Sequence, residues 1–159
     1  MHWKVRREFL SRVEIFAGIG ARDLKALAKS CSEATYQDGD VLCRQGERGV
    51  AAYLIVSGRI RVENEADDGT VIPVIELGQG NFVGELSLID GAERVATIRA
   101  IGEVEVLVLT QWSMSALLKT RPSIAAAMLP IIVKRFRATA IQLRHRDRDS
   151  EEGRKTILH

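Results

Sequence analysis

The chain has 159 residues, of which 46% are hydrophobic and 28% are charged, and its formal net charge is +2. This length suits one domain with its own core, and the small net charge excludes an overall field that would draw the protein onto nucleic acid or a membrane. No apolar run approaches the roughly 20 residues needed to span a bilayer, and the N-terminus lacks the hydrophobic stretch of a signal peptide. We therefore expect a cytoplasmic protein whose partners include neither nucleic acid nor a membrane.

The N-terminal segment is predicted to be helical. Apolar side chains recur every three to four residues over residues 3–16, which is typical of an amphipathic helix. Gly18 and Gly20 then restart the pattern, and the stretch from Ala21 to Ala28 suits a second short helix.

From Thr35 the pattern changes to short strands separated by turn residues. Residues 51–64 read as a strand, a glycine and a second, half-buried strand, and residues 96–109 supply the last strands. The sequence ADDGT at residues 66–70 is a hairpin signal, and Pro73 just beyond it predicts an edge strand or a bulge. Several short strands with regular turn signals favour an antiparallel β-barrel or jelly roll over a parallel sheet.

The C-terminal part is predicted to be helical again. Residues 112–120 suit one short helix, and Pro122 can occupy the first turn of the next, which we expect to run to about His145 with a local bend at Pro130. That long helix carries an apolar stripe made of Leu129, Ile132, Val133, Phe136, Ala140 and Leu143.

The predicted fold class is therefore α+β, mainly β, with a barrel or jelly roll flanked by N-terminal helices and a long C-terminal helix. We expect one domain over residues 1–146 and a polar, disordered tail over residues 147–159, where charges of both signs mix.

The cysteines and histidines offer no catalytic or metal-binding pattern. Cys31 and Cys43 lack metal or redox spacing, so we interpret them as reduced thiols used in packing. His2, His145 and His159 lie at or near the chain ends, whereas a metal hydrolase or an acid–base enzyme needs converging groups on a rigid frame. We therefore predict no enzyme activity, no metal and no cofactor.

One segment interrupts the strands with a single turn of helix that begins at Gly84. The first N–H groups of a helix lack partners and attract an anion, and a glycine there lets a ligand approach the backbone. Arg94 offers a planar fork of donors that fits a phosphate, and Glu85 accepts hydrogen bonds from hydroxyls such as those of a sugar. These residues fit a phosphate beside a ribose. A salt bridge between Glu85 and Arg94 that staples the loop is the open alternative.

The wider pattern resembles the phosphate-binding cassette of the cyclic nucleotide-binding domain family, the type found in catabolite activators and protein kinase A regulatory subunits. The residues that match this cassette are Gly80, Phe82, Gly84, Glu85, Leu86, Leu88, Gly91, Arg94, Ala96, Thr97 and Ala100. Segment 15–19 also looks like the family's entry residues, and segments 38–49, 53–62 and 77–85 look like its glycine-punctuated barrel, so the resemblance covers roughly residues 10–145.

The resemblance implies roles for the cassette residues. Arg94 would bind the exocyclic oxygens of the cyclic phosphate, and Glu85 would accept from the ribose 2′-hydroxyl. Ser87 would either add a hydroxyl or cap the short helix. The backbone amides that would complete the phosphate and ribose contacts are those of Gly84, Leu86 and Ala96.

Selectivity and the base pocket rest on the same resemblance. Family members that favour cGMP often carry Thr directly after the arginine, and Val95 has no such donor, which indicates cAMP over cGMP. An ungapped alignment with the bacterial catabolite activators places Val62 and Val74 at the walls of the purine pocket. It places Arg135 and Thr139 where those proteins contact the base. Thr139 is either a base contact or an ordinary helix threonine, and Arg135 is either a ligand contact or a charge that is solvated or rests on the barrel.

The leading hypothesis is a stand-alone sensor that binds cAMP and is closed by its last helix, with a homodimer through that helix. We expect neither the helix-turn-helix nor the kinase segments that family members carry. An idle site in a protein-interaction module and an enzyme acting on the same ligand are the alternatives. The enzyme would need a metal pair or an activated base, which the histidine distribution does not offer.

Overall fold

The computed structural model describes the backbone of residues 1–157 and the side chains of residues 1–148. Within this described part the chain forms five α-helices, one short 3-10 helix and six β-strands. The helices are α1 (Trp3–Ser11), η1 (Glu14–Phe16), α2 (Ala21–Ser30), α3 (Glu85–Asp90), α4 (Gln111–Thr120) and α5 (Pro122–Ile157). The strands are β1 (Ser32–Tyr36), β2 (Val41–Cys43), β3 (Ala51–Glu65), β4 (Val71–Leu77), β5 (Phe82–Val83) and β6 (Thr97–Thr110).

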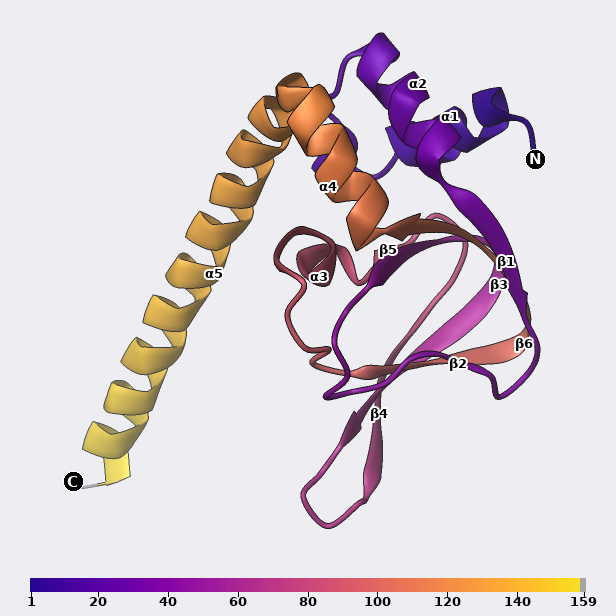
Figure 1. Cartoon of the computed structure of the whole chain (residues 1–159). Coiled ribbons are helices and arrows are strands. Elements are labelled where there is room, and N and C mark those ends of the chain that lie inside the picture. The colour runs from indigo at the N-terminus through magenta and orange to yellow at the C-terminus, as the bar shows by residue number, and fades with distance from the viewer. Residues whose placement is uncertain (158–159) are drawn as a thin grey trace.

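The strands form one antiparallel sheet in the order β1-β6-β3-β4, with β2 paired to β6 and β5 paired to β3. Figure 1 shows this sheet curled below α1, α2 and α4, with α3 set against its side and α5 running away from it. The arrangement is the predicted jelly roll, and its hydrogen bonding does not close into a full barrel. α3 and its flanking loops, which contain most of the predicted cassette residues, are inserted between β5 and β6.

The strands predicted within residues 51–64 form one long strand, β3, and those predicted within residues 96–109 form one long strand, β6. β3 runs through Gly58 without a break, and its register against β6 shifts on both sides of Ser57. The backbone of Gly58 has a φ of +87°, and a Cβ there would collide with the carbonyl oxygen of Glu103. The glycine therefore allows a bulge that bends the strand, where the sequence pattern predicted an end.

The hairpin between β3 and β4 confirms the predicted turn. Gly69 N–H donates to the carbonyl of Ala66 at 2.8 Å, and Ala66 N–H donates to that of Thr70 at 2.9 Å. Both expectations for Pro73 hold, because β4 is an edge strand and its register against β3 shifts beside this residue. Val71, Ile72, Val74 and Ile75 of β4 are exposed on a hairpin that projects from the body in Figure 1.

Two hydrophobic clusters hold the fold together. One joins the helices to the sheet and includes Phe16, Leu27, Leu54 and Ile124; the other lies inside the curled strands around Ile60. The predicted helix over residues 3–16 is wrong in its second half, because the backbone becomes extended at the residue before η1. This change of direction lets η1 insert its apolar side chains into the first cluster.

Both cysteines are free thiols, as predicted. Burial raises the pKa of Cys31 to about 12, so its thiol is inert at neutral pH. Cys43 is partly buried, and burial raises its pKa as well.

The long helix α5 begins at Pro122 as predicted, and it is bent by 111° from α4. It passes through Pro130 as one helix and continues to Ile157, so the expected end near His145 was wrong. The chain has no glycine or proline between Pro130 and Gly153 that would stop it. The boundary at residue 146 and the disorder of the tail stay predictions, since side chains beyond residue 148 and all of residues 158–159 lie outside the described part.

Most of the apolar stripe on α5 is exposed, with Phe136 at 74% and Leu129 at 58%, while Ile132 packs against the first cluster. In the described chain, no single helix is both long and apolar enough to cross a bilayer. The bent pair of α4 and α5 meets that test only when the two are taken together, by length and composition alone.

The bulge in β3 makes a stability prediction. Gly58→Ala and Gly39→Ala both place an alanine at a φ near +85°, since these glycines have φ values of +87° and +83°. Each should lose roughly 1–2 kcal/mol for the left-handed backbone. Gly58→Ala should lose about 1–3 kcal/mol more through overpacking, because nothing lies within 4 Å of a Cβ at Gly39. Urea melts of both variants measure the difference, and equal losses would contradict the packed bulge.

Candidate functional site

A pocket of ≈ 390 Å³ lies beside α3, within the size range of small-molecule sites. Eight of the sequence-predicted site residues line it: Val62, Gly84, Glu85, Leu86, Ser87, Arg94, Val95 and Ala96. They come from β3, the start of α3 and the loop that leads into β6. The structure thus brings eight of the eleven predicted site residues to one hollow.

The guanidinium of Arg94 is the buried charge of this pocket. Only 6% of the residue is exposed. Nη1 donates to the carbonyl of Gly84 at 3.2 Å, and Nη2 donates to the carbonyl of Ala51. Nε is buried without a hydrogen-bond partner, and no carboxylate of the described residues forms an ion pair with this guanidinium. A buried cation without a countercharge is unfavourable, so this wall of the pocket suits an anion.

Gly84 is required here for the position of Arg94. It caps α3 with a φ of +82°, a conformation that favours glycine. A Cβ at this position would collide with Arg94 Nη1 and would lie 3.1 Å from the carbonyl oxygen of Ala51. The sequence predicted that the missing Cβ lets a ligand approach; the structure adds that it first makes room for the arginine.

Glu85 does not pair with Arg94, so the salt bridge that would staple the loop does not form. Its Oε1 instead contacts Nη1 of Arg135, and Arg135 Nε lies 3.8 Å from Glu14 Oε1. Arg135 is thus a charge that rests on the body of the domain, one of the two alternatives that its sequence position left open. Through it, α5 is tied to the first residue of α3.

Three predicted residues do not line the pocket: Arg135, Val74 and Thr139. Val74 was expected at a wall of the purine pocket, but it is 55% exposed on β4. The register jumps from Val62–Ile75 to Glu63–Pro73, so Val74 is the extra residue of the bulge, and strand alternation does not give its direction.

Thr139 is exposed, and its Oγ1 donates to the carbonyl of Arg135 at 3.1 Å, as an ordinary helix threonine does. In this arrangement α5 leaves the pocket open. The rim beside it is correspondingly bare, with Val95 87% exposed and Leu86 68% exposed.

Sequence reasoning missed several residues that line the pocket. Asp90, Ala92 and Glu93 belong to the cassette loop and could have been found from their neighbours in the sequence. Cys43 comes from β2, about 50 positions before the arginine, and no local pattern marks it. Among the described residues, no group of three or more His, Cys, Asp or Glu side chains is placed to hold a metal ion.

Comparisons with known proteins agree with this geometry. The family model described as "Cyclic nucleotide-binding domain" matches residues 33–121. A CRP-like cAMP-activated global transcriptional regulator of Mycobacterium tuberculosis is 28% identical over 132 residues, which is 83% of this chain and 59% of the relative. A cAMP-dependent protein kinase regulatory subunit of Dictyostelium discoideum is 35% identical over 102 residues, 62% of this chain and 31% of the relative. The chain therefore spans less than two thirds of the length of these relatives.

A solved structure supports the same assignment. The N-terminal domain of a transcriptional regulator from Streptomyces coelicolor is 32% identical, with a TM-score of 0.75 over 82% of this chain and 94% of that one. The family model covers more than half of the chain, and the residues it spans include the pocket and its buried arginine. The chain belongs to the cyclic nucleotide-binding domain family.

Proposed function

We propose that this chain is a cAMP-binding regulatory module in which Arg94 holds the cyclic phosphate and Glu85 holds the ribose. One observation carries the proposal: the guanidinium of Arg94, a residue only 6% exposed, has an unpartnered Nε and no ion pair with any described residue, and it forms one wall of a ligand-sized pocket. A monoanionic phosphate supplies the missing countercharge and acceptors.

The surrounding residues fit the remaining parts of the ligand. Ser87 and the backbone of Gly84, Leu86 and Ala96 line the same pocket as the guanidinium and can donate to phosphate or ribose oxygens. Glu85 has one carboxylate oxygen engaged by α5 and a second that can accept from the 2′-hydroxyl. The base then points toward Val62 and the open rim.

Closure of α5 over that rim is the regulatory step in this proposal. The helix now projects away from the sheet, and most of its apolar stripe is exposed. A swing about Arg121, where α4 and α5 meet, would bring the stripe and Thr139 toward the base. The ligand shifts this equilibrium only if it binds the closed form more tightly than the open one. A second copy that covers the exposed remainder of the stripe would give the homodimer.

The proposed location of the protein and the proposed lack of turnover rest on simpler observations. Two free thiols support a reducing, cytoplasmic location. We propose binding without turnover, because the described pocket residues include no histidine and no metal-ligand cluster.

Arg94→Ala tests phosphate capture. It should weaken cAMP binding roughly 10- to 100-fold, because a charged donor contributes about 1.5–3 kcal/mol. Isothermal titration measures the loss, and a melt with and without ligand checks that the variant folds. Arg61→Ala is the matched control, since that arginine lies outside the pocket with Glu63 and Glu76. Absence of wild-type binding would favour the interaction module, and unchanged affinity in Arg94→Ala would overturn the phosphate assignment.

Val95→Thr tests base selectivity. The wild type should prefer cAMP, and the added hydroxyl should improve cGMP relative to cAMP about 3- to 10-fold through one hydrogen bond. The residue is 87% exposed, so the change should not affect folding. Val95→Ala removes bulk without adding a donor and should leave the ratio near the wild-type value. If both variants change the ratio alike, pocket size and not the hydroxyl sets selectivity.

Arg135→Ala separates two roles of that side chain. If Arg135 competes with the ribose for Glu85, its loss should tighten cAMP binding by up to about fivefold, the range of a partly exposed ion pair. If it contacts the base in the closed form, binding should weaken. We expect the tightening. Arg137→Ala removes an exposed charge two positions away on α5 and should have no effect.

A further inference from the structure

A second hollow lies at the helical end of the molecule, formed by α2 and the corner between α4 and α5. Its volume is ≈ 520 Å³, and the side chains that line it are Arg22, Lys25, Ala26, Lys29 and Arg121. Four of these five residues are cations, so the hollow has a strongly positive wall. Nothing in the proposed nucleotide site uses it.

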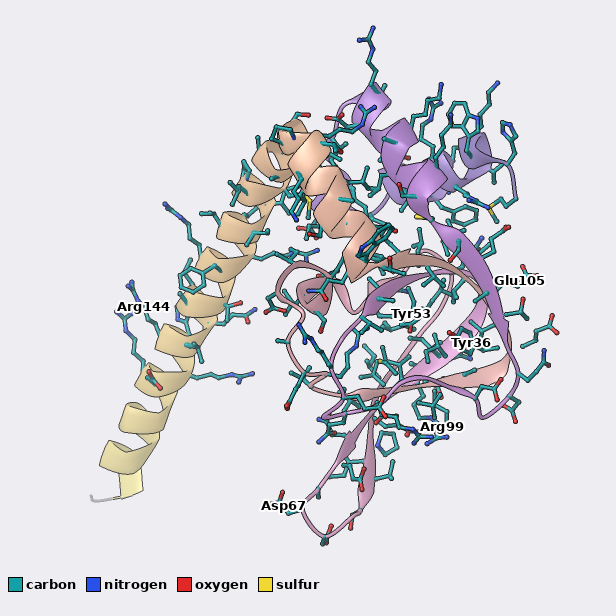
Figure 2. All side chains as sticks on the ribbon, in the orientation of Figure 1. Tyr36, Tyr53, Asp67, Arg99, Glu105 and Arg144 are labelled. Atoms are coloured by element: carbon teal, nitrogen blue, oxygen red, sulfur yellow. The ribbon has the colours of Figure 1, made fainter. Side chains whose placement is uncertain are left out.

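Further cations converge on the neighbouring Trp3 in α1. Lys25 Nζ lies 4.7 Å from the centre of the indole ring, and Lys29 Nζ lies 5.8 Å from it. The ring also has Arg7 at 5.7 Å and Lys4 at 6.0 Å. Figure 2 shows nitrogen-tipped side chains crowded around α1 and α2. The basic face is the set formed by Lys4, Arg7, Arg22, Lys25, Lys29 and Arg121.

The charge of the basic face is largely uncompensated. Within the described residues only one of its six cations has an ion pair, which joins Arg121 to Asp23 Oδ1 at 3.1 Å. The whole chain has 23 Lys and Arg against 21 Asp and Glu, so this concentration is local. Contact with the indole offsets part of the mutual repulsion, and an anionic partner would remove the rest.

We propose that the basic face docks an acidic segment of a partner protein, with carboxylate side chains entering the hollow beside α2. We choose an acidic partner because its negative charge complements the positive basic face. The hollow is concave, which favours the entry of individual side chains over contact with a nucleic-acid duplex. A lipid surface fits less well. Of the large apolar side chains in α1 and α2, only Val5 is exposed, whereas interfacial helices insert an apolar face. This docking does not depend on cAMP.

The test uses a fluorescein-labelled oligoglutamate peptide and measures its fluorescence anisotropy with the full chain at about 0.1 M salt. The wild type should bind it, and binding should disappear at about 1 M salt, where the Debye length is about 3 Å. The double variant Lys25→Glu, Lys29→Glu should bind at least about tenfold more weakly, because it replaces two attractive charges with two that repel the acidic peptide. A thermal melt checks that it folds.

The matched control is Lys134→Glu, Arg137→Glu, which makes the same change in net charge on exposed positions of α5. It should stay within about twofold of the wild type if the site is local. An equal loss in both variants, or no wild-type binding at low salt, would overturn the proposal. Tighter binding to phosphatidylserine vesicles or to a DNA duplex at equal anionic charge would overturn it in favour of a membrane or a nucleic acid.

Discussion

The pocket depends on one buried charge, the guanidinium of Arg94. Removing a cation from water is costly, and the domain offsets this with two backbone carbonyls, those of Ala51 at the start of β3 and Gly84 at the cap of α3. These bonds pin the loop before β6 to the strand and to the short helix at once. Carbonyl oxygens carry only partial charges, so the offset is incomplete and an anion beside the guanidinium is still favourable. One side chain therefore both holds the cassette together and leaves it suited to phosphate.

The short helix α3 is held in place by its surroundings. Six residues are far too few for an isolated helix in water. Leu88 anchors it in the core that joins helices and sheet, and Ser87 is buried against the body of the domain. Gly49 has no Cβ, which leaves the space that the Ser87 side chain occupies. The start of α3 is thus rigid at its inner side, while Glu85 and Leu86 face the pocket.

Local chemistry was predictable from the sequence, and long-range contacts were not. Gly84, Glu85 and Arg94 lie within eleven positions, and their chemistry indicates an anion site before any fold is known. The partner of Glu85 is 50 positions away on α5, so no local pattern could replace the expected salt bridge. Val74 was placed by an ungapped alignment, and neither that alignment nor a local pattern shows that Val74 is the extra residue of a bulge in β4.

The continuity of β3 was hidden for a related reason. A glycine inside a strand pattern is compatible with an end or with a bulge, and only the neighbouring strand decides between them. The placement of α5 is the hardest case. Its sequence fixes a helix with an apolar stripe, but the 111° bend at Arg121 decides whether Thr139 and the stripe meet the pocket or the solvent.

The contact between α5 and the cassette is suited to regulation because it is weak. Glu85 and Arg135 are each partly exposed, so their pair contributes at most about 1 kcal/mol. A ribose hydroxyl would not displace a fully buried ion pair. Without any ion pair, the position of α5 would not depend on whether Glu85 binds a ligand. In the proposed function one carboxylate is shared between helix and ligand, so occupancy of the pocket and the position of α5 would be linked equilibria that a small difference in free energy shifts.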